Sequence, residues 1–245
     1  MPREALAGAV AALALSGLMA CRLANSTSPV PRSASDAATP RSAAPSAGPA
    51  PARGPVSEPR IRCNLLLGVA VTSEWFEAGF ERVVDDARWE AITKPHTSLE
   101  QWADEHDSVW SLAPSSACAE HAQAPERVLF TAMNWQYTTA AEWQAGLVGV
   151  VHATLARFPS VQKVVILTMI RAPGNRSCGN PMSVVEPFVD EAVSAVAAQF
   201  PQRVQVGPKL EAPACDVFKN GGPHFSDAGR AVMAQRIGEY FAHEP

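Results

Sequence analysis

The sequence predicts an α/β domain built on a mostly parallel sheet. Short apolar runs alternate with longer amphipathic stretches along the chain, as in folds where strands and helices take turns. Three of the amphipathic stretches open on Ser or Thr with Glu three residues later, which is the pattern of a capping box. The apolar runs are continuous, which is typical of strands buried on both faces.

The apolar runs give five expected strands. The clearest is VQKVVILTMI at 161–170, whereas WEAI at 89–92 is the weakest. The full set is 63–70, 89–92, 127–133, 161–170 and 203–206. With helices on both faces, these strands predict a three-layer sandwich around a flavodoxin-like, five-stranded sheet.

The expected helices alternate with these strands. The stretch 74–88 has apolar residues on one side, and the capping boxes begin at Thr97, Thr139 and Ser183. A final helix follows His224. Its apolar residues recur at helical spacing and are Ala231, Val232, Ala234, Ile237, Tyr240 and Phe241.

The first 20 residues are typical of an export signal. Residues 1–20 carry Arg3 and then an apolar run that is too short to span a bilayer. The run ends in Leu-Met-Ala before Cys21, which resembles a bacterial lipobox, where the cysteine is lipidated after cleavage. The alternative is an ordinary secretory signal with a chance cysteine. Both interpretations place the protein outside the cytoplasm, and the lipobox predicts a lipoprotein of the bacterial cell envelope, bound to the membrane through Cys21.

Residues 21–60 are expected to be a disordered tether in front of a single domain at 61–245. The tether is rich in Pro, Ala and Ser, contains eight prolines and has no apolar periodicity. The domain carries 14 Lys and Arg against 21 Asp and Glu, a net charge of −7. Because an acidic surface repels phosphate, binding to nucleic acid is not expected.

Four cysteines remain once Cys21 is assigned to lipid. An even number in an oxidising compartment predicts two disulfides, and the absence of a CxxC spacing argues against zinc. The spacing alone allows three pairings. Cys63 and Cys118 precede expected strands, whereas Cys178 and Cys215 follow them. We therefore expect the pairs 63–118 and 178–215.

Ligands of open parallel sheets bind outside the carboxyl ends of the strands. The expected strands bring four segments to that edge, 68–73, 134–137, 171–182 and 208–224. His224 follows a Gly-Gly-Pro turn in the last of these segments. A loop histidine at this edge is a candidate general base.

Three of these positions together resemble the SGNH, or GDSL-type, hydrolase superfamily. They are Gly68 at the end of the first strand, Asn134 after the third expected strand, and His224 before the final helix. The resemblance covers nearly all of 61–245 in order and spacing. It implies an ester hydrolase without a cofactor, in which a Gly-Asp-Ser supplies the nucleophile, a Gly-x-Asn supplies an oxyanion donor, and an Asp-x-x-His supplies the base and its orienting carboxylate.

The match to this pattern is partial. Asn134 is present in Ala-Met-Asn, where its amide keeps the group that an oxyanion hole needs. Ala70 stands at the position of the serine, and Gly221 stands three residues before His224 in place of the aspartate. Because an alanine has no group that attacks a carbonyl, the sequence predicts a triad that has lost two members.

Nearby residues offer substitutes for both lost groups. Thr72 or Ser73 follows the position of the nucleophile, and Asp216 or Asp227 lies near His224 in the sequence. A hydroxyl two or three residues out of register is misplaced for attack, because a nucleophile and its base must meet at about 3 Å. The alternative role for Ser73 is that of a helix N-cap.

Aromatic residues gather beside the carboxyl-edge segments. Trp75, Phe76, Trp135 and Tyr137 either stack on a sugar ring or an acyl chain, or pack in the core. The acidic run around His106 is expected to be a solvated helix end and not a metal site.

Two functions follow from these residues. The first is a pseudoenzyme that binds a glycan or a partner in a cleft formed with Gly68, Ala70, Trp135 and Tyr137. The second is an active esterase or acylhydrolase that uses Ser73, or another non-standard triad, with His224 and Asn134. The expected ligand in either case is an acylated carbohydrate or a small ester.

Overall fold

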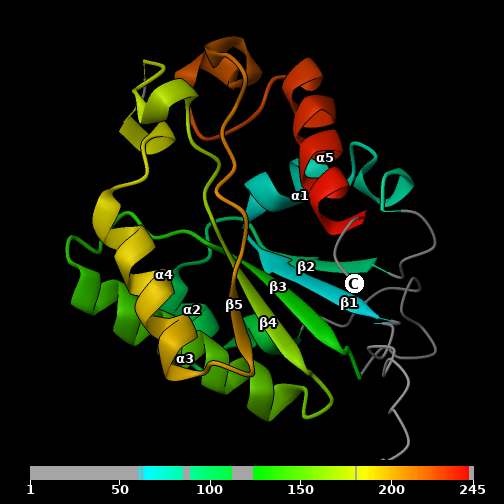
Figure 1. Ribbon diagram of the computed structural model, residues 1–245, viewed down its shortest axis with the longest axis vertical. Coiled ribbons are helices and arrows are strands. Elements are labelled where there is room, and N and C mark those ends of the chain that lie inside the picture. Colours follow the sequence, from blue (N-terminus) through cyan, green and yellow to red (C-terminus); the bar gives the residue numbers. More distant parts are fainter. Residues whose placement is uncertain (1–60, 62, 85–88, 112–123, 180, 243–245) are drawn as a thin grey trace, which may run out of the picture. The chain divides into compact units, whose positions relative to one another are not determined.

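The computed structural model describes residues 61, 63–84, 89–111, 124–179 and 181–242. Their core is a five-stranded sheet with the strand order β2-β1-β3-β4-β5, in which every pairing is parallel (Figure 1). The predicted α/β fold class is confirmed. The strands are β1 Asn64–Gly68, β2 Trp89–Thr93, β3 Arg127–Ala132, β4 Lys163–Thr168 and β5 Val204–Val206.

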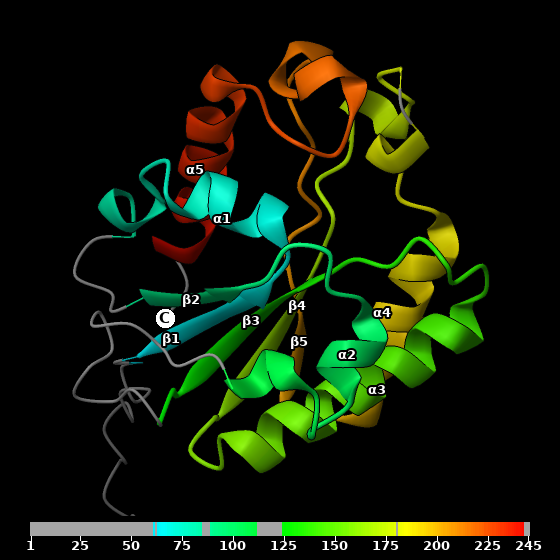
Figure 2. The same ribbon diagram turned by 180° about the vertical axis from the view of Figure 1, so that it is seen from behind.

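Helices cover both faces of the sheet, so the predicted three layers are present (Figures 1 and 2). One face carries α1 Ala70–Phe76 and α5 Asp227–Ala242. The other face carries α2 Leu99–Ala103, α3 Ala140–Arg157 and α4 Pro187–Gln199. Within the described part of the chain, no helix has the length and apolar character to cross a membrane.

The sheet separates two apolar cores because successive strand side chains point to opposite faces. Leu65 and Leu67 of β1 belong to the core under α2, α3 and α4. Leu66 belongs to the core under α1 and α5. All three are at most 1% exposed, and burying a leucine side chain contributes roughly 1.5–3 kcal/mol. The continuous apolar runs of the sequence are therefore explained by two covered faces.

Helix α1 begins four residues earlier than the sequence predicts. Val69 is its N-cap and Ala70 its first residue, directly after β1. The helix ends at Phe76, and Gly79 then takes a φ of 114°, which favours glycine. The expected start at 74, a continuous helix beyond Phe76 and the N-cap role of Ser73 are wrong, since Ser73 lies inside α1; residues 85–88 of the expected helix lie outside the described residues.

The three predicted capping boxes have different outcomes. The box of Thr139 and Glu142 is present at the start of α3. The box at the start of α2 lies one residue later than predicted, with Ser98 as N-cap and Gln101 as its partner. This shift leaves the carboxylate of Glu100 available for other contacts.

The third box, predicted at Ser183, does not cap α4. Helix α4 begins at Pro187 with Glu186 as N-cap and no side-chain capping bond. Proline suits the first turn because its fixed φ is helical and its missing N–H has no partner there. The proline therefore sets the start of this helix.

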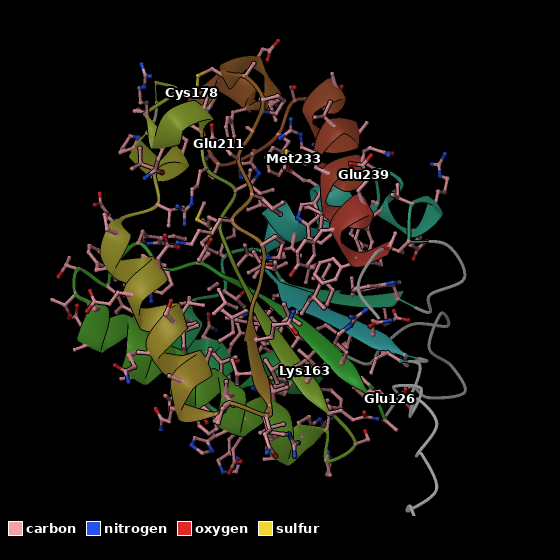
Figure 3. All side chains as sticks on the ribbon, in the orientation of Figure 1. Glu126, Lys163, Cys178, Glu211, Met233 and Glu239 are labelled. Atoms are coloured by element: carbon pink, nitrogen blue, oxygen red, sulfur yellow. A yellow bond between two sulfur atoms is a disulfide. The ribbon has the colours of Figure 1, made fainter. Side chains whose placement is uncertain are left out.

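The predicted disulfide between Cys178 and Cys215 is present, with a Cα–Cα distance of 5.3 Å. It joins the loop after β4 to the loop after β5. In Figure 3, Cys178 lies at one end of the domain, whereas Glu126 and Lys163 mark the opposite end, where β3 and β4 begin. The predicted pair 63–118 involves Cys118, which lies outside the described residues, as do Cys21 and the tether.

Candidate functional site at the carboxyl edge of the sheet

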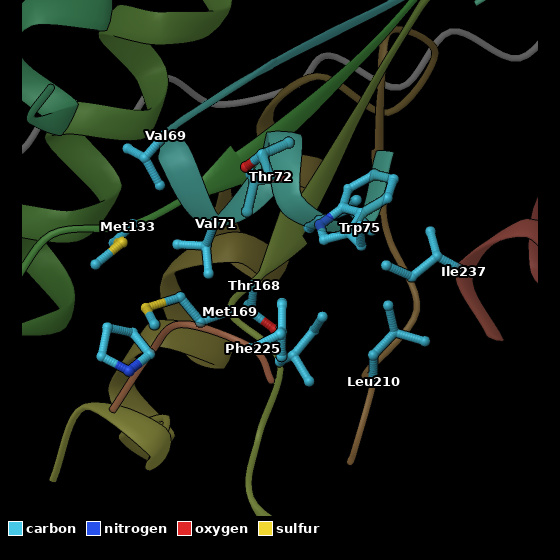
Figure 4. Close-up of a pocket in the computed structure, with 14 residues that line it drawn as sticks. Val69, Val71, Thr72, Trp75, Met133, Thr168, Met169, Leu210, Phe225 and Ile237 are labelled. Carbon is cyan, nitrogen blue, oxygen red and sulfur yellow. The ribbon is translucent and has the colours of Figure 1, made fainter. Parts of the chain in front are cut away.

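A small cavity of about 30 Å³ lies where β1, β3 and β4 end (Figure 4). Its lining includes Val69 and Val71, which flank Ala70, and Met133, which precedes Asn134. It also includes Pro223 and Phe225, which flank His224. The structure therefore brings the three motif segments of the sequence to one place.

Gly68 contributes backbone and close packing at this edge. A Cβ at Gly68 would lie 2.3 Å from the Oγ1 of Thr72, so β1 and α1 approach as closely as they do only with glycine there. Thr72 is fully buried beneath this contact. Thr72 lines the small cavity, but its hydroxyl has less than 1 Å² of accessible area, so it is not presented for attack as the lost serine would be.

The loop that carries His224 is held by backbone contacts. The N–H of Lys219 donates to the carbonyl of His224 at 2.7 Å, and the N–H of Ser226 donates to the carbonyl of Val217 at 2.8 Å. Gly229 of α5 packs on the same carbonyl, because a Cβ there would lie 2.1 Å from it. These contacts fix the entry into α5 and with it the position of the imidazole.

The imidazole of His224 is paired with a carboxylate from α1. Its Nδ1 lies 2.8 Å from Oε1 of Glu74, and the N–H of Phe225 donates to Oε2 of the same carboxylate at 2.9 Å. Arg230 of α5 places Nη2 3.7 Å from Oε1. The Glu74 side chain is 14% exposed and the His224 side chain 53%. Glu74 is the residue that sequence reasoning missed.

This pairing corrects one expectation. The sequence predicts that His224 has lost its orienting carboxylate, because residue 221 is glycine, and offers Asp216 or Asp227 instead. The carboxylate that His224 contacts belongs to Glu74. With Nδ1–H donated to Glu74, the neutral ring keeps its lone pair on Nε2, which is the tautomer of a general base.

The residue at the position of the nucleophile, Ala70, carries no hydroxyl group. Ala70 is the first residue of α1, one helical turn before Glu74. The hydroxyl of Ser73 donates to the carbonyl of Ala70 at 2.8 Å, as serines inside helices commonly do. The base and its carboxylate are thus assembled although the residue one helical turn before Glu74 has no proton to give.

Asn134 is also bonded differently from an oxyanion donor. Its Nδ2 donates to both carboxylate oxygens of Glu100, each at 3.1 Å. Its Oδ1 accepts from the N–H groups of Gln136 and Tyr137. Partial burial, the largest single influence, raises the pKa of Glu100, but hydrogen bonds from Ser98, its own backbone, Tyr137 and Asn134 together hold that pKa below its usual value. The amide is therefore engaged with a carboxylate that stays ionised.

A second, larger cavity, of about 320 Å³, adjoins Asn134, and we name it the aromatic pocket. It lies between the loop after β3 and the segment that leads into α4. Trp135 beside it is 57% exposed. The lining residues are Ala132, Met133, Asn134, Trp135, Tyr137, Trp143, Met169, Pro181, Val184, Val185, Glu186, Phe188 and Val189.

The four aromatic candidates divide into two groups. Trp75 is 2% exposed and packs edge-on against Phe80 in the core under α1 and α5, and Phe76 packs beside it. Trp135 and Tyr137 line the aromatic pocket. The core-packing interpretation therefore holds for the first pair, and the second pair is placed to contact a ligand.

Comparison with known proteins gives little further information. No protein family and no curated protein matches this chain. Among solved structures, it is similar to a carbohydrate esterase family 3 from Talaromyces cellulolyticus. The two are 15% identical, the match covers 73% of this chain and 95% of that one, and the TM-score is 0.42.

The acidic run around His106 is solvated. The His106 side chain is 86% exposed, with Nε2 3.6 Å from a carboxylate oxygen of Glu105. Across the described ranges, no three His, Cys, Asp or Glu side chains gather as metal ligands. The helix-end interpretation of this run agrees with its exposure.

The Tyr137 hydroxyl gives a direct test of the contacts around Glu100. Burial, a hydrogen bond to Glu100 and the charges of Glu100 and Glu142 raise the pKa of Tyr137 to about 12. A tyrosine with a raised pKa stabilises the fold fully below its ordinary pKa of 10.0, and this contribution is lost as the pH rises through about 12. Spectrophotometric titration of the two tyrosines should show one late step.

The controls assign that step. Tyr137→Phe should remove it and Tyr240→Phe should leave it. Glu100→Gln should move the late step to lower pH. The step should still lie above the ordinary tyrosine pKa of 10.0, because Tyr137 remains partly buried. A late step that persists in Tyr137→Phe would belong to Tyr240 and would contradict the raised pKa of Tyr137.

Proposed function

We propose that this domain is a pseudoenzyme, descended from an SGNH-type ester hydrolase, that binds an acylated carbohydrate or a related ester without cleaving it. One observation carries the proposal, namely that Ala70 stands at the position of the nucleophile, one helical turn before the Glu74 that holds His224. Methyl groups do not attack carbonyls, so the base has no hydroxyl proton of a nucleophile to remove.

Recognition is supported by the aromatic pocket. Asn134, whose amide binds the ionised carboxylate of Glu100, and the exposed Trp135 line this cavity, which is large enough for a small molecule. A hydroxylated ring offers hydrogen bonds to the first and a flat face to the second. These groups are present although the nucleophile is absent, which favours binding over a loss of all function.

The protein is further proposed to be a lipoprotein of the bacterial cell envelope, held by lipid on Cys21 and spaced from the membrane by residues 21–60. This part of the proposal rests on the lipobox-like run before Cys21 and on the composition of the tether. Metabolic labelling with an alkyne fatty acid should tag the wild-type protein. Cys21→Ser should not be tagged, and tagging of that variant would refute the anchor.

The pseudoenzyme proposal is tested on the full chain in detergent. A fluorophosphonate probe should label no residue, and p-nitrophenyl acetate should be hydrolysed no faster than in buffer. The second candidate function, an active ester hydrolase, is favoured by the His224–Glu74 pair. Labelling that is lost in Ser73→Ala would establish that alternative.

Ser194→Ala is the matched control for this assay. The hydroxyl of Ser194 donates to the carbonyl of Asp190 at 2.7 Å on α4, as Ser73 does on α1. Ser194→Ala therefore removes the same kind of hydrogen bond, from a serine hydroxyl to a helix carbonyl, on a different helix from Ser73. Equal loss of labelling in both variants would point to a folding defect in the Ser73 variant, and mass spectrometry of the labelled peptide would then identify the reactive residue.

A further inference from the structure

We infer that the aromatic pocket binds a quaternary ammonium group, which its rings and two nearby carboxylates hold by electrostatic attraction. This inference rests on the proposed function, because it narrows the proposed ester ligand to one that carries such a cation. It is carried by the lining of the pocket, by the charges around it and by the hydrogen bonds that those charges already make.

The lining combines aromatic rings with sulfur atoms and aliphatic side chains. Trp135, Tyr137 and Phe188 contribute rings, and Met133 and Met169 contribute thioethers. Trp135 is 57% exposed, so a ligand can reach its ring. The face of an aromatic ring is negative and attracts a cation, and tryptophan attracts it most strongly. The walls therefore suit a cation that has an apolar surface.

The charges around the pocket are negative. Glu186 lines it, and Glu100 accepts hydrogen bonds from Asn134, which lines it too. No lining residue is basic. Across the described ranges, neither carboxylate forms an ion pair with a lysine or an arginine. The pocket therefore favours a positive ligand over a neutral or an anionic one.

A neighbouring carboxylate on α4 shows the contrast. Asp190 lies one helical turn after Glu186, and it is paired with both Arg171 and Lys209. Two cations thus compensate the carboxylate that does not line the pocket, whereas the one that does line it is left without such a partner. A cationic ligand would supply the missing partner.

The oxygens of Glu100 favour a cation without N–H groups. Burial alone would raise the pKa of Glu100, but hydrogen bonds from Ser98, its own backbone, Tyr137 and Asn134 hold that pKa below its usual value. These bonds use most of the acceptor positions of the carboxylate. A primary ammonium needs acceptors for its N–H groups, whereas a quaternary ammonium needs only negative charge and apolar contact. The ligand class is therefore the quaternary ammonium.

The size and position of the pocket agree with this class. At about 320 Å³, it has room for roughly ten non-hydrogen atoms, if each takes the ~30 Å³ that a water occupies in the liquid. Met133 and Met169 line both this pocket and the small cavity of the candidate site (Figure 4). An ester with a trimethylammonium group in the pocket can thus extend towards the residues that flank Ala70 and His224.

The test measures binding of choline to the full chain in a non-ionic detergent by calorimetry. The control ligand is the neutral analogue of choline, in which a tert-butyl group replaces the trimethylammonium group. Choline should bind about 5- to 30-fold more tightly than this analogue, because the shape is the same and the charge is lost. Ethanolamine should bind more weakly than choline. Equal binding of choline and either of these compounds, or no binding of choline, would overturn the inference.

Variants of Trp135 test the aromatic contribution. Trp135→Leu should weaken choline binding about 3- to 30-fold, and Trp135→Phe should weaken it less, because a ring remains. Neither variant should change the binding of the neutral analogue by more than about 2-fold, since both keep an apolar side chain. Because Trp135 is exposed, these substitutions leave the core intact. An unchanged affinity for choline in Trp135→Leu would contradict the proposed site.

Glu186→Gln tests the contribution of charge. Glu186 makes no side-chain capping bond to α4, so this change removes the charge without removing such a bond. At low salt it should weaken choline binding roughly 2- to 5-fold. The matched control is Glu191→Gln, at an exposed position of the same helix that does not line the pocket, and it should have no effect. Equal weakening in both variants would show general attraction by an acidic surface and overturn the site.

Phosphatidylcholine vesicles distinguish the two sources of this chemistry, a soluble compound and a lipid headgroup. The Cys21→Ser chain should remain in the supernatant when the vesicles are sedimented, because the carboxylates of Glu186 and Glu100 repel the phosphate of the headgroup. Sedimentation that choline reverses would assign the headgroup as the source and keep the quaternary ammonium site.

The two proposals fail separately. Choline binding together with turnover of p-nitrophenyl esters would keep the cation site and overturn the pseudoenzyme. No choline binding and no turnover would overturn the cation site and leave the loss of catalysis in place.

Discussion

Ala70→Ser alone should give the protein measurable esterase activity, about 10²-fold above the wild type with p-nitrophenyl acetate. The substitution places a hydroxyl on the first residue of α1, one turn from Glu74. Residues at that spacing share a helix face, and Glu74 already holds the imidazole through Nδ1. General-base assistance of this kind contributes roughly 10²–10⁴-fold. Initial rates across pH values check the result.

Glu74 makes a second substitution unnecessary. The sequence alone places glycine at 221, where the resemblance expects the orienting aspartate, whereas the structure supplies that carboxylate from Glu74. Adding Glu74→Gln to Ala70→Ser should remove most of the gained activity. Glu77→Gln, at the exposed C-cap of the same helix, should leave that activity intact. A folded Ala70→Ser protein with no hydrolysis would show that His224 does not reach residue 70.

Removal of the Cys178–Cys215 disulfide should lower the free energy of unfolding by about 3–4 kcal/mol. The bond closes a segment with a sequence separation of 37, and the loss of chain entropy on closing a loop of that size corresponds to this figure. The double variant Cys178→Ser with Cys215→Ser shows the effect in urea unfolding. The urea concentration at the midpoint of unfolding should fall. The dependence of the free energy of unfolding on urea concentration should stay within the range of a two-state domain.

The control for the disulfide changes the neighbours of the two cysteines. Ser177→Ala with Ala214→Ser alters exposed positions next to each sulfur and should change the free energy of unfolding by less than about 0.5 kcal/mol. Equal unfolding curves for the wild type and the double cysteine variant would contradict the bond.

The strands could be predicted from the sequence because burial on both faces demands unbroken apolar runs. Even the weakest, at Trp89, forms a full strand beside β1. The alternation of strands and helices also predicted that the loops after β4 and β5 lie at the same edge of the sheet. Because Cys178 and Cys215 lie in these two loops, their disulfide was predictable. These features depend on composition and chain order, which the sequence states directly.

The start of α1 and the partners of the polar side chains were not predictable in the same way. Ala70 and Val71 continue the apolar run of β1, so the sequence does not mark the start of the helix, although Thr72 packs closely on Gly68 in the folded chain. Glu74 lies 150 residues from His224, and no pattern near the histidine points to it. A carboxylate one turn after Ala70 was the available signal.

The layer formed by α1 and α5 joins the beginning and the end of the domain. Met233, Ile237 and Phe241 of α5 complete the core that Leu66 and Trp75 begin. During synthesis from the N-terminus, the core under α2, α3 and α4 can be completed once β5 is made. The core under α1 and α5 stays incomplete until α5 is made. During synthesis the sheet therefore keeps one apolar face uncovered, and a chain that stops before α5 presents that face to chaperones and to other chains.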